Sequence, residues 1–439
     1  MLSFQAVSSA LPERVGRLYV AYSGGVDSHV LLHLCARQPD WQAKLCGVYV
    51  DHRLQAESTA WGTHCRRQCE ALGVEFLLLT VDASAAPGES PEAAARRARY
   101  AALADLLDRD DVVLAAQHRE DQLETVLLQL FRGAGVAGLA AMPRISPLGR
   151  GSLVRPLLKV GKAEVLVYAR QQGLVWIEDP SNATNDFDRN FLRNQVLPLL
   201  KQRWPGLDKT VARSAELCGE AAECLDEWAE AQLAAVSGLD RGELAIDQLP
   251  VAASRRRLLI RQWLARNGLR PPSRAITEAI LAQVVDARGD ANPQLCYQGA
   301  LIRRYRKRLV CVPAHPAVRT HGEVVWPDNA QQIELGGGCR LSKEVSVDGI
   351  AQALWDRASV TVRFRRGGEK LKLPGRGGRH SLKKLYQAAG TPPWEREWRP
   401  LIYLDGRLAA VAGLWVAEWV SGSKNEPCYR VSWQFRQSV

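Results

Sequence analysis

The residues with the clearest chemical meaning lie in one short segment near the N-terminus, Ser23-Gly24-Gly25-Val26-Asp27-Ser28. The segment follows an apolar run predicted as a strand, Leu18–Ala21, and precedes a helix predicted over residues 28–37. A glycine-rich turn at the start of a helix exposes backbone N–H groups, and the helix dipole there also favours negative charge. Asp27 adds a hard oxygen ligand that suits Mg²⁺. The sequence therefore predicts a turn that binds a phosphate and an associated magnesium ion.

Two glycines alone would be an ordinary connection between a strand and a helix, but the complete hexapeptide favours a functional role. It has neither the lysine of the GxxxxGK[ST] loop nor the spacing of the GxGxxG fingerprint. The segment resembles the PP-loop of the ATP pyrophosphatases, which cleave ATP between its α and β phosphates and transfer AMP to a substrate. The resemblance implies that ATP binds here, on Ser23, Gly24, Gly25, Val26, Asp27 and Ser28.

The first half of the chain alternates short apolar strands with amphipathic helices. Strands are expected at 18–21, 45–50, 75–81 and 112–116, with helices near 28–37, 57–72 and 90–108. This alternation predicts an α/β fold with a doubly wound parallel sheet. In such sheets the loops after the strands lie at one edge, where ligands bind. We therefore expect the PP-loop, Asp51-His52 and Gln117-His118 to converge on one cleft.

Charged side chains on two predicted helices are expected at the same cleft. Asp121 and Glu124 are three residues apart, so they share a helix face, and they closely follow His118. Arg96 and Arg99 share a face of the preceding helix and suit phosphate oxygens. The alternative is that the carboxylates only complement a helix dipole and that the arginines are solvated. The position of His118 at a strand end favours a function for the carboxylate pair.

The composition predicts a cytoplasmic protein with several folded domains. The 439 residues are 46% hydrophobic, which is enough for large cores, and no apolar run reaches the length of a membrane span. The first ten residues lack the charged start and apolar centre of an export signal. The ten cysteines include no CxxC pair, so we expect reduced thiols in packing roles rather than a zinc site.

The positive charge of the chain predicts an anionic partner larger than ATP. The net charge is +11, and residues 361–400 hold eleven Lys or Arg against three Glu. A nucleic acid is the expected partner, and the alternative is an ordinary solvated basic surface.

Changes of pattern along the chain predict an ATP-binding catalytic domain over 1–215, a mainly helical domain over 216–313, a linker over 314–331 and a small basic α+β domain over 332–439.

Several segments, in order along nearly the whole chain, resemble the tRNA(Ile)-lysidine synthetase family. They are the PP-loop, His118–Thr125, Arg155–Leu158, Glu178–Arg193, Ser381–Leu385 and Pro393–Arg396. The resemblance implies a ligase that adenylates C2 of the wobble cytidine in the CAU anticodon of isoleucine tRNA. Free L-lysine is then attached, and AMP and pyrophosphate are released. The resemblance also implies ATP and Mg²⁺ as cofactors and allows a homodimer.

The resemblance further implies roles for individual residues. Arg96 and Arg99 stabilise developing phosphate charge, and Asp27 holds Mg²⁺. His118, and with it His52, moves a proton as the lysine amine attacks. The ammonium groups of lysine are held by Asp121 and Glu124. Contacts with tRNA are expected from Asn182, Arg189, Arg193, Lys383 and Lys384.

Two positions depart from the family pattern. Glu120 stands where Asp commonly precedes the Asp-Gln pair, and Asp51 stands before His52 where Asn is frequent. Both changes keep a polar oxygen near the cleft. The longer side chain of Glu120 moves its carboxylate by roughly one C–C bond length, which puts a direct metal role for this residue in doubt.

Three other functions remain open at this point. A PP-loop tRNA thiolase would use the same adenylation, but such enzymes need cysteine pairs or a catalytic cysteine. A PP-loop ligase that forms an amide on a small carboxylate would not need the basic C-terminal domain. A non-catalytic RNA-binding protein would explain the charge but not Asp27 or the acidic segment after His118.

Overall fold

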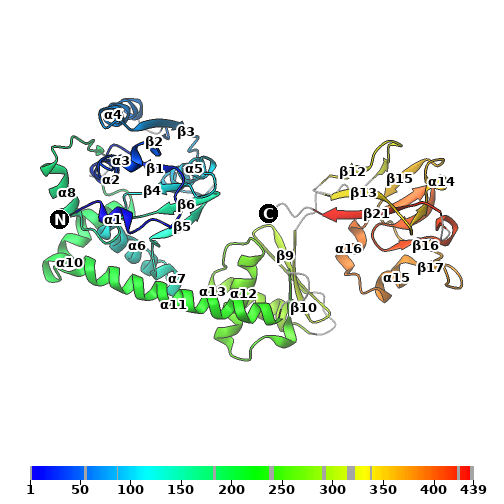
Figure 1. Ribbon diagram of the computed structural model, residues 1–439. Helices are drawn as coiled ribbons and strands as arrows, with labels where there is room; N and C mark the ends of the chain where they lie inside the picture. The colour runs from blue at the N-terminus through cyan, green and yellow to red at the C-terminus, as the bar shows by residue number, and fades with distance from the viewer. Residues whose placement is uncertain are drawn as a thin grey trace. The chain divides into compact units, whose positions relative to one another are not determined.

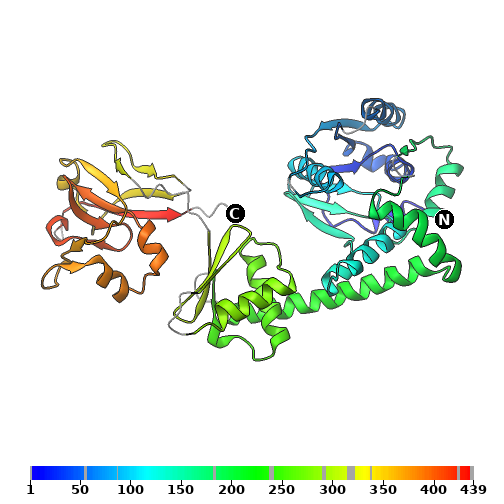
Figure 2. The same ribbon diagram turned by 180° about the vertical axis from the view of Figure 1, so that it is seen from behind.

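The computed structural model describes residues 2–53, 57–86, 88–180, 184–236, 242–288, 293–313, 322–336, 339–422 and 426–435 (Figures 1 and 2). The chain divides into two compact units, Met1–Asp226 and Glu227–Val439. The predicted boundary between residues 215 and 216 falls inside helix α11 (Leu207–Val236). Within the described ranges, no helix combines the length and the apolar character that crossing a membrane requires.

A six-stranded sheet forms the centre of the first unit (Figure 1). Its strand order is β3-β2-β1-β4-β6-β5, and each neighbouring pair except β5 and β6 is parallel. The strands are β1 (Leu18–Ala21), β2 (Leu45–Asp51), β3 (Glu75–Thr80), β4 (Val112–Leu114), β5 (Ile145–Leu148) and β6 (Gly151–Val154). The main helices are α2 (Val26–Ala36), α4 (Ser58–Ala71), α5 (Pro91–Asp105), α6 (Arg119–Phe131) and α8 (Lys162–Gln171). The predicted doubly wound α/β fold is confirmed.

Alternate residues of the central strand pack against helices on opposite faces of the sheet. On one face, Leu18 and Val20 of β1 join a core that includes α2, α4 and α8. On the other face, Tyr19 packs with Leu103 of α5. A strand that is covered on both faces must be apolar at every position. This requirement explains the unbroken apolar run that marks β1 in the sequence.

The strand order places a crevice at the carboxyl ends of β1 and β4. From β1 the chain continues through β2 to β3 on one side of the sheet, and it then returns to the other side of β1 as β4. The loops that leave β1 and β4 therefore diverge, and such a point is where open α/β sheets bind ligands. The first loop carries the PP-loop residues and the second carries His118.

The N-terminal part of the second unit is helical and also carries an antiparallel sheet. Its helices include α12 (Ala253–Arg266) and α13 (Arg274–Ile280). The four strands have the order β7-β10-β9-β8, and they are β7 (Glu243–Ala245), β8 (Gln294–Tyr297), β9 (Ala300–Tyr305) and β10 (Arg308–Pro313). One buried core, centred on residues such as Trp263, joins the helices to the sheet.

The C-terminal part of the second unit has α+β character, as predicted. One sheet has the order β11-β15-β18-β19-β20 and another has the order β12-β13-β21-β14. The longer strands are β13 (Cys339–Ser346), β15 (Val360–Arg363), β18 (Leu401–Leu404), β19 (Arg407–Val411) and β21 (Cys428–Phe435). The shorter strands are β11 (Glu323–Val325), β12 (Gln332–Glu334), β14 (Ile350–Ala351) and β20 (Trp415–Val416). The helices are α14 (Gln352–Trp355), α15 (Leu382–Ala388) and α16 (Pro393–Trp398).

Part of the predicted linker over 314–331 belongs to this C-terminal fold. Residues 314–321 lie outside the described ranges. Strand β11 (Glu323–Val325) pairs antiparallel with β15, and Trp326 is buried in the core, 5.2 Å from the Trp355 ring. The prediction of a linker is wrong from residue 322 onward. The prolines of this segment indicated a break, but a strand as short as β11 at a sheet edge leaves little periodicity in the sequence.

We predict that Trp326→Ala destabilises the C-terminal fold. Removing a large buried aromatic side chain costs about 3–5 kcal/mol, and Trp326 is only 1% exposed. Hydrogen exchange on the full chain should show lost protection in β13, β15 and β21 and unchanged protection in β1 and β2. The neighbouring Val325→Ala, at a side chain that is 64% exposed, is the control. Equal protection in both variants would show that the segment does not support the core.

Candidate functional site

The turn between β1 and α2 has the backbone shape that a phosphate site needs. Gly24 adopts a φ of +81°, which an L side chain rarely tolerates. A Cβ atom at Gly24 would lie 2.6 Å from Cδ1 of Ile177 and 3.1 Å from Sγ of Cys65. The backbone N–H of Ile177 also donates to the Gly24 carbonyl at 2.9 Å. Glycine is therefore required here by conformation and by close packing.

Hydrogen bonds between its two ends hold this turn in shape. The Ser28 hydroxyl donates to the Gly25 carbonyl at 3.0 Å, accepts from the Ser23 N–H at 3.2 Å, and lies 3.1 Å from the Ser23 hydroxyl. Beneath the turn, the Tyr22 hydroxyl lies 2.5 Å from Nδ1 of His29. Burial lowers the pKa of His29 to about 4, so the ring is neutral at pH 7. The turn is therefore fixed before any ligand binds.

Asp27, in the first turn of α2, carries an ion pair with a residue far away in the sequence. The Lys162 ammonium donates to both carboxylate oxygens of Asp27 at 2.7 Å. Lys162 is the first residue of α8. Nε2 of His118 lies 3.8 Å from the same carboxylate. Asp27 thus already holds a cation at the position where the sequence predicts Mg²⁺.

His118 lies in a network of carboxylates. Its Nδ1 is 3.2 Å from Glu120 and its Nε2 is 3.4 Å from Asp121. Burial lowers the pKa of His118, but the neighbouring carboxylates, Glu120 first among them, outweigh burial and raise it above its ordinary value. Burial also raises the pKa of Glu120, but the contacts with His118 and with the Lys162 N–H lower it to about 2. The extra length of Glu120 is therefore used to reach His118 and α8.

Two carboxylates and two arginines form a buried cluster beside this network. Glu124 is 1% exposed and accepts from Nε of Arg193 at 2.7 Å, and it lies 3.0 Å from Nε of Arg189. Arg193 also donates to Asp121 at 3.0 Å. The sequence assigned the carboxylates to lysine and the arginines to tRNA. In the structure these residues contact one another, so the two predicted groups form one site.

A cavity of about 240 Å³ joins the predicted ATP residues to this cluster. Arg96 and Arg99 enter it from α5, and the Arg99 guanidinium lies 3.2 Å from Nε2 of His52. The Ser90 hydroxyl caps the N-terminus of α5 by accepting a hydrogen bond from the Ala93 N–H. The charged and polar residues around the cavity are Ser23, Asp27, Ser28, Arg96, Arg99, Gln117, Asp121 and Arg189. Most residues predicted for the catalytic site are therefore gathered around one space.

The expected convergence of three loops on one cleft is wrong for Asp51. Its carboxylate accepts from the Arg53 N–H at 2.8 Å and lines a separate cavity beside α4. Asp51 is not among the residues that line the cavity at the PP-loop, whereas His52 contacts Arg99, which does line it. The cleft is formed by the loops after β1 and β4 together with α5.

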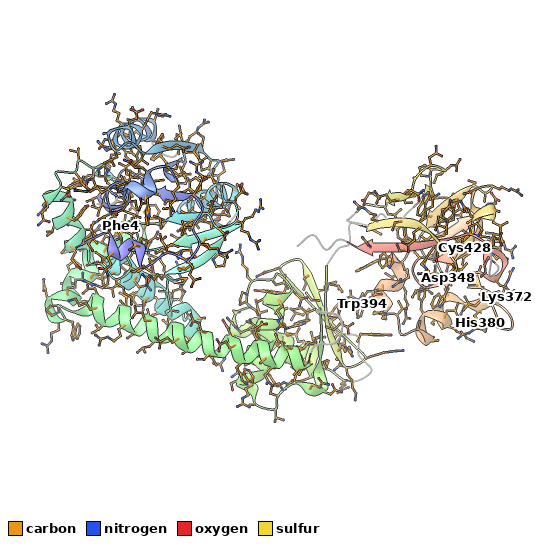
Figure 3. The ribbon with its side chains drawn as sticks, viewed as in Figure 1. Phe4, Asp348, Lys372, His380, Trp394 and Cys428 are labelled. Atoms are coloured by element: carbon orange, nitrogen blue, oxygen red, sulfur yellow. The ribbon has the colours of Figure 1, made fainter. Side chains whose placement is uncertain are left out.

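Other predicted tRNA residues belong to the second unit or lie outside the described ranges. Asn182 belongs to the latter group. Lys383 and Lys384 are exposed on α15, which belongs to the second unit. Lys372 and His380 of the same basic segment are labelled in Figure 3. These positions are compatible with contact to a large anion, and their role stays a prediction.

The sequence interpretation missed Lys162, and it placed Gln117 at the cleft without giving it a role. Gln117 lines the cavity, and its buried Oε1 has no hydrogen-bond partner within the described part of the chain. Lys162 had a detectable signal. It follows Gly161 at the start of a helix, where the dipole disfavours a cation. A nearby anion offsets this unfavourable interaction, and here that anion is Asp27.

The donor atoms fit magnesium only in part. No group of three or more His, Cys, Asp or Glu side chains among the described residues could hold a metal ion. Asp27 offers two hard oxygen atoms that already bind a cation. Magnesium is commonly held by one or two carboxylates, with substrate phosphates and water as the other ligands. Asp27 fits that arrangement when a polyphosphate lies on the adjacent turn.

Comparisons with known proteins cover most of the chain. Family profiles match residues 3–200 (PP-loop domain), 248–310 (TilS substrate binding domain) and 360–433 (TilS substrate C-terminal domain). The tRNA(Ile)-lysidine synthase of Methylococcus capsulatus is 41% identical over 418 residues, which is 94% of this chain and 95% of the relative. That of Serratia proteamaculans is 41% identical over 98% of both chains.

Among solved structures, the U34-tRNA thiolase NcsA from Methanococcus maripaludis matches with a TM-score of 0.41 and 18% identity. The match covers 49% of this chain and 78% of that chain.

We predict that Gly24→Ala weakens ATP binding by more than about tenfold. The left-handed backbone costs about 1–2 kcal/mol for an alanine, and the new methyl group would press on Ile177. Calorimetric titration with ATP and Mg²⁺ measures the effect. Gly88→Ala is the matched control, because Gly88 has a φ of +83° and nothing within 4 Å of its Cβ position. Wild-type ATP affinity in Gly24→Ala would contradict the assignment of the turn.

Proposed function

Because the chain belongs to the tRNA(Ile)-lysidine synthase family, we propose that it attaches free L-lysine to the wobble cytidine of the CAU anticodon of isoleucine tRNA. In this proposal ATP is consumed at the cavity between the PP-loop and α5. One observation carries the assignment of the site. A single cavity is lined by the PP-loop serines, two arginines and the start of the acidic helix α6. Identity of about 40% with lysidine synthases over nearly the full chain disfavours a thiolase or a non-catalytic RNA-binding protein.

The first step transfers AMP to the base. The N–H groups at the start of α2 and the hydroxyls of Ser23 and Ser28 hold the pyrophosphate half of ATP. O2 of cytidine attacks the α-phosphorus, an O2–P bond forms, and the bond from the α-phosphorus to the bridging oxygen breaks, so pyrophosphate leaves. Arg96 and Arg99 stabilise the charge on the α-phosphate, since guanidinium groups donate in a bidentate manner.

Magnesium, when bound with ATP, screens the negative charge of the phosphates. Asp27 is the residue that would hold it, because its carboxylate faces the turn and already pairs with a cation. The turn keeps Asp27 in place through the hydrogen bonds of Ser23 and Ser28.

The second step replaces AMP by lysine. The uncharged ε-amine attacks C2 of the base, a C–N bond forms, and the C2–O2 bond breaks, so AMP leaves with O2. The amine must lose a proton, and His118 lies between Asp27 and Asp121 where it can accept one. Its pKa is raised, so the neutral, accepting form of the ring predominates only at a pH above the ordinary value of 6.5.

Lysine is held by Asp121 and Glu124 in this proposal. In the structure Arg189 and Arg193 form ion pairs with these carboxylates. Glu124 is too deeply buried to remain without a positively charged partner. The ammonium groups of lysine would share the carboxylates with the arginines, or Arg193 would turn outward toward tRNA.

The exposed Lys383 and Lys384 would contact the phosphates of the tRNA body. A homodimer stays a prediction.

The assay for this function uses ATP, Mg²⁺, labelled lysine and unmodified isoleucine tRNA with a CAU anticodon. We predict that label enters the tRNA, with one pyrophosphate released per lysine. Asp27→Asn should lose pyrophosphate release by roughly a hundredfold or more, because a preorganised charge contact is removed, while tRNA binding persists. Asp108→Asn is the control, since that side chain is 79% exposed. Absence of label with the wild-type protein would reject the function, and normal turnover of Asp27→Asn would reject the site.

We also predict a specific pH dependence of the lysine step. The pKa of His118 is raised in the folded protein, so its base form grows as pH increases through a value above 6.5. The single-turnover rate of AMP release by lysine should therefore show an inflection above pH 6.5. His118→Gln should lose this inflection and be slower by about 10²-fold, whereas His380→Gln, in the second unit, should keep it. An unchanged inflection in His118→Gln would exclude His118 as the proton acceptor.

A further inference from the structure

Lys162 is a charged residue of the site that has no role in the two proposed reaction steps, although it forms an ion pair with Asp27. Its side chain is 34% exposed and that of Asp27 is 31% exposed, so the pair lies at the wall of the site rather than in open solvent. The ammonium is equally distant, at 2.7 Å, from the two carboxylate oxygens. It therefore takes the position between these oxygens that another cation bound at Asp27 would need.

The backbone of Lys162 is fixed independently of its side chain. Its N–H donates to Glu120 at 2.9 Å, and Glu120 contacts His118. The preceding Gly161 donates to Glu164, one turn into α8. Four flexible carbons separate this fixed backbone from the ammonium. The ammonium can thus change its partner while α8 and the Glu120–His118 contact remain in place.

A second cation at the position that the Lys162 ammonium takes between the two Asp27 oxygens would be strongly repelled. At short distance the interaction of like charges is unfavourable even at an effective dielectric of about 20. A divalent ion at Asp27 therefore requires the ammonium to leave, and the ammonium then needs a new anion. A triphosphate on the neighbouring turn supplies such an anion, because Ser23, Asp27 and Ser28 face one cavity.

We propose that Lys162 is a positioning residue that occupies Asp27 in the nucleotide-free protein and moves to the phosphate oxygens when ATP binds. The proposal rests on the assignment of Asp27 to the metal in the proposed function. Before ATP arrives, the Lys162 ammonium fixes the carboxylate and keeps metal ions away from it. After ATP arrives, the same charge contributes to holding the phosphates. The metal then enters with the nucleotide and not before it.

The test measures Mn²⁺ binding to the nucleotide-free protein by electron paramagnetic resonance. Lys162→Met removes the charge and keeps most of the side-chain length. We expect it to bind Mn²⁺ about tenfold more tightly than the wild type, since a competing cation is gone. The same variant should bind ATP several-fold more weakly in the presence of Mg²⁺. A role in packing alone would not move these two affinities in opposite directions.

Two further variants serve as controls. Lys159→Met makes the same charge change three residues earlier, at a side chain that is 74% exposed and pairs with Glu216, and both affinities should stay at the wild-type values. Lys162→Arg keeps the charge and should keep weak Mn²⁺ binding. Wild-type Mn²⁺ affinity in Lys162→Met, with a wild-type circular dichroism spectrum, would overturn the proposal. If Lys162→Met does not fold, strong Mn²⁺ binding by Lys162→Arg would overturn it instead.

The double variant Asp27→Asn/Lys162→Met separates this proposal from the proposed function. If Lys162→Met binds Mn²⁺ tightly and the double variant does not, the metal is at Asp27 and both assignments stand. If the double variant still binds tightly, the ion lies elsewhere, and both the metal role of Asp27 and the exchange at Asp27 fail. If neither variant differs from the wild type, only the role of Lys162 fails, because Asp27 can still bind the metal together with ATP.

Discussion

The site is built on a turn between β1 and α2 whose backbone shape is fixed by contacts within the protein. The first N–H groups of a helix have no partner within the helix, and at this turn they face the crevice between β1 and β4. Packing at Gly24, the hydrogen bonds of Ser28 and the buried Tyr22–His29 contact fix that shape. The rest of the site is arranged around this turn, since α5, α6 and α8 place their charges next to it.

Charge balance is the second constraint on the site. Four carboxylates, those of Asp27, Glu120, Asp121 and Glu124, lie in the N-terminal parts of α2 and α6. Without positively charged partners their mutual repulsion would destabilise the site. The structure pairs Asp27, Asp121 and Glu124 with Lys162, Arg189 and Arg193, and His118 lies against Glu120. The lysine and the two arginines come from segments distant in the sequence, so tertiary contacts balance much of the charge of the site. The arrangement of an ATP-dependent tRNA ligase therefore depends on tertiary packing as much as on the PP-loop hexapeptide.

The sequence was sufficient for the features that depend on local pattern. Alternating strands and helices predicted the parallel sheet, and the hexapeptide predicted a glycine turn between a strand and a helix, which the structure contains. Contacts between distant segments were not predictable in this way. Lys162 lies 135 residues from Asp27, and Arg193 lies 69 residues from Glu124. The place of Asp51 at another cavity and the burial of Trp326 also depend on contacts with residues far away in the sequence, which no local pattern specifies.

The central claim is that the triphosphate of ATP lies on the β1–α2 turn with its metal at Asp27. The most direct measurement is a crystal structure of the protein with a non-hydrolysable ATP analogue and Mg²⁺. The account predicts phosphate oxygens on the N–H groups at the start of α2, the α-phosphate near Arg96 and Arg99, and a metal ion within coordination distance of Asp27. An analogue bound in another cavity, with the turn empty, would contradict the account.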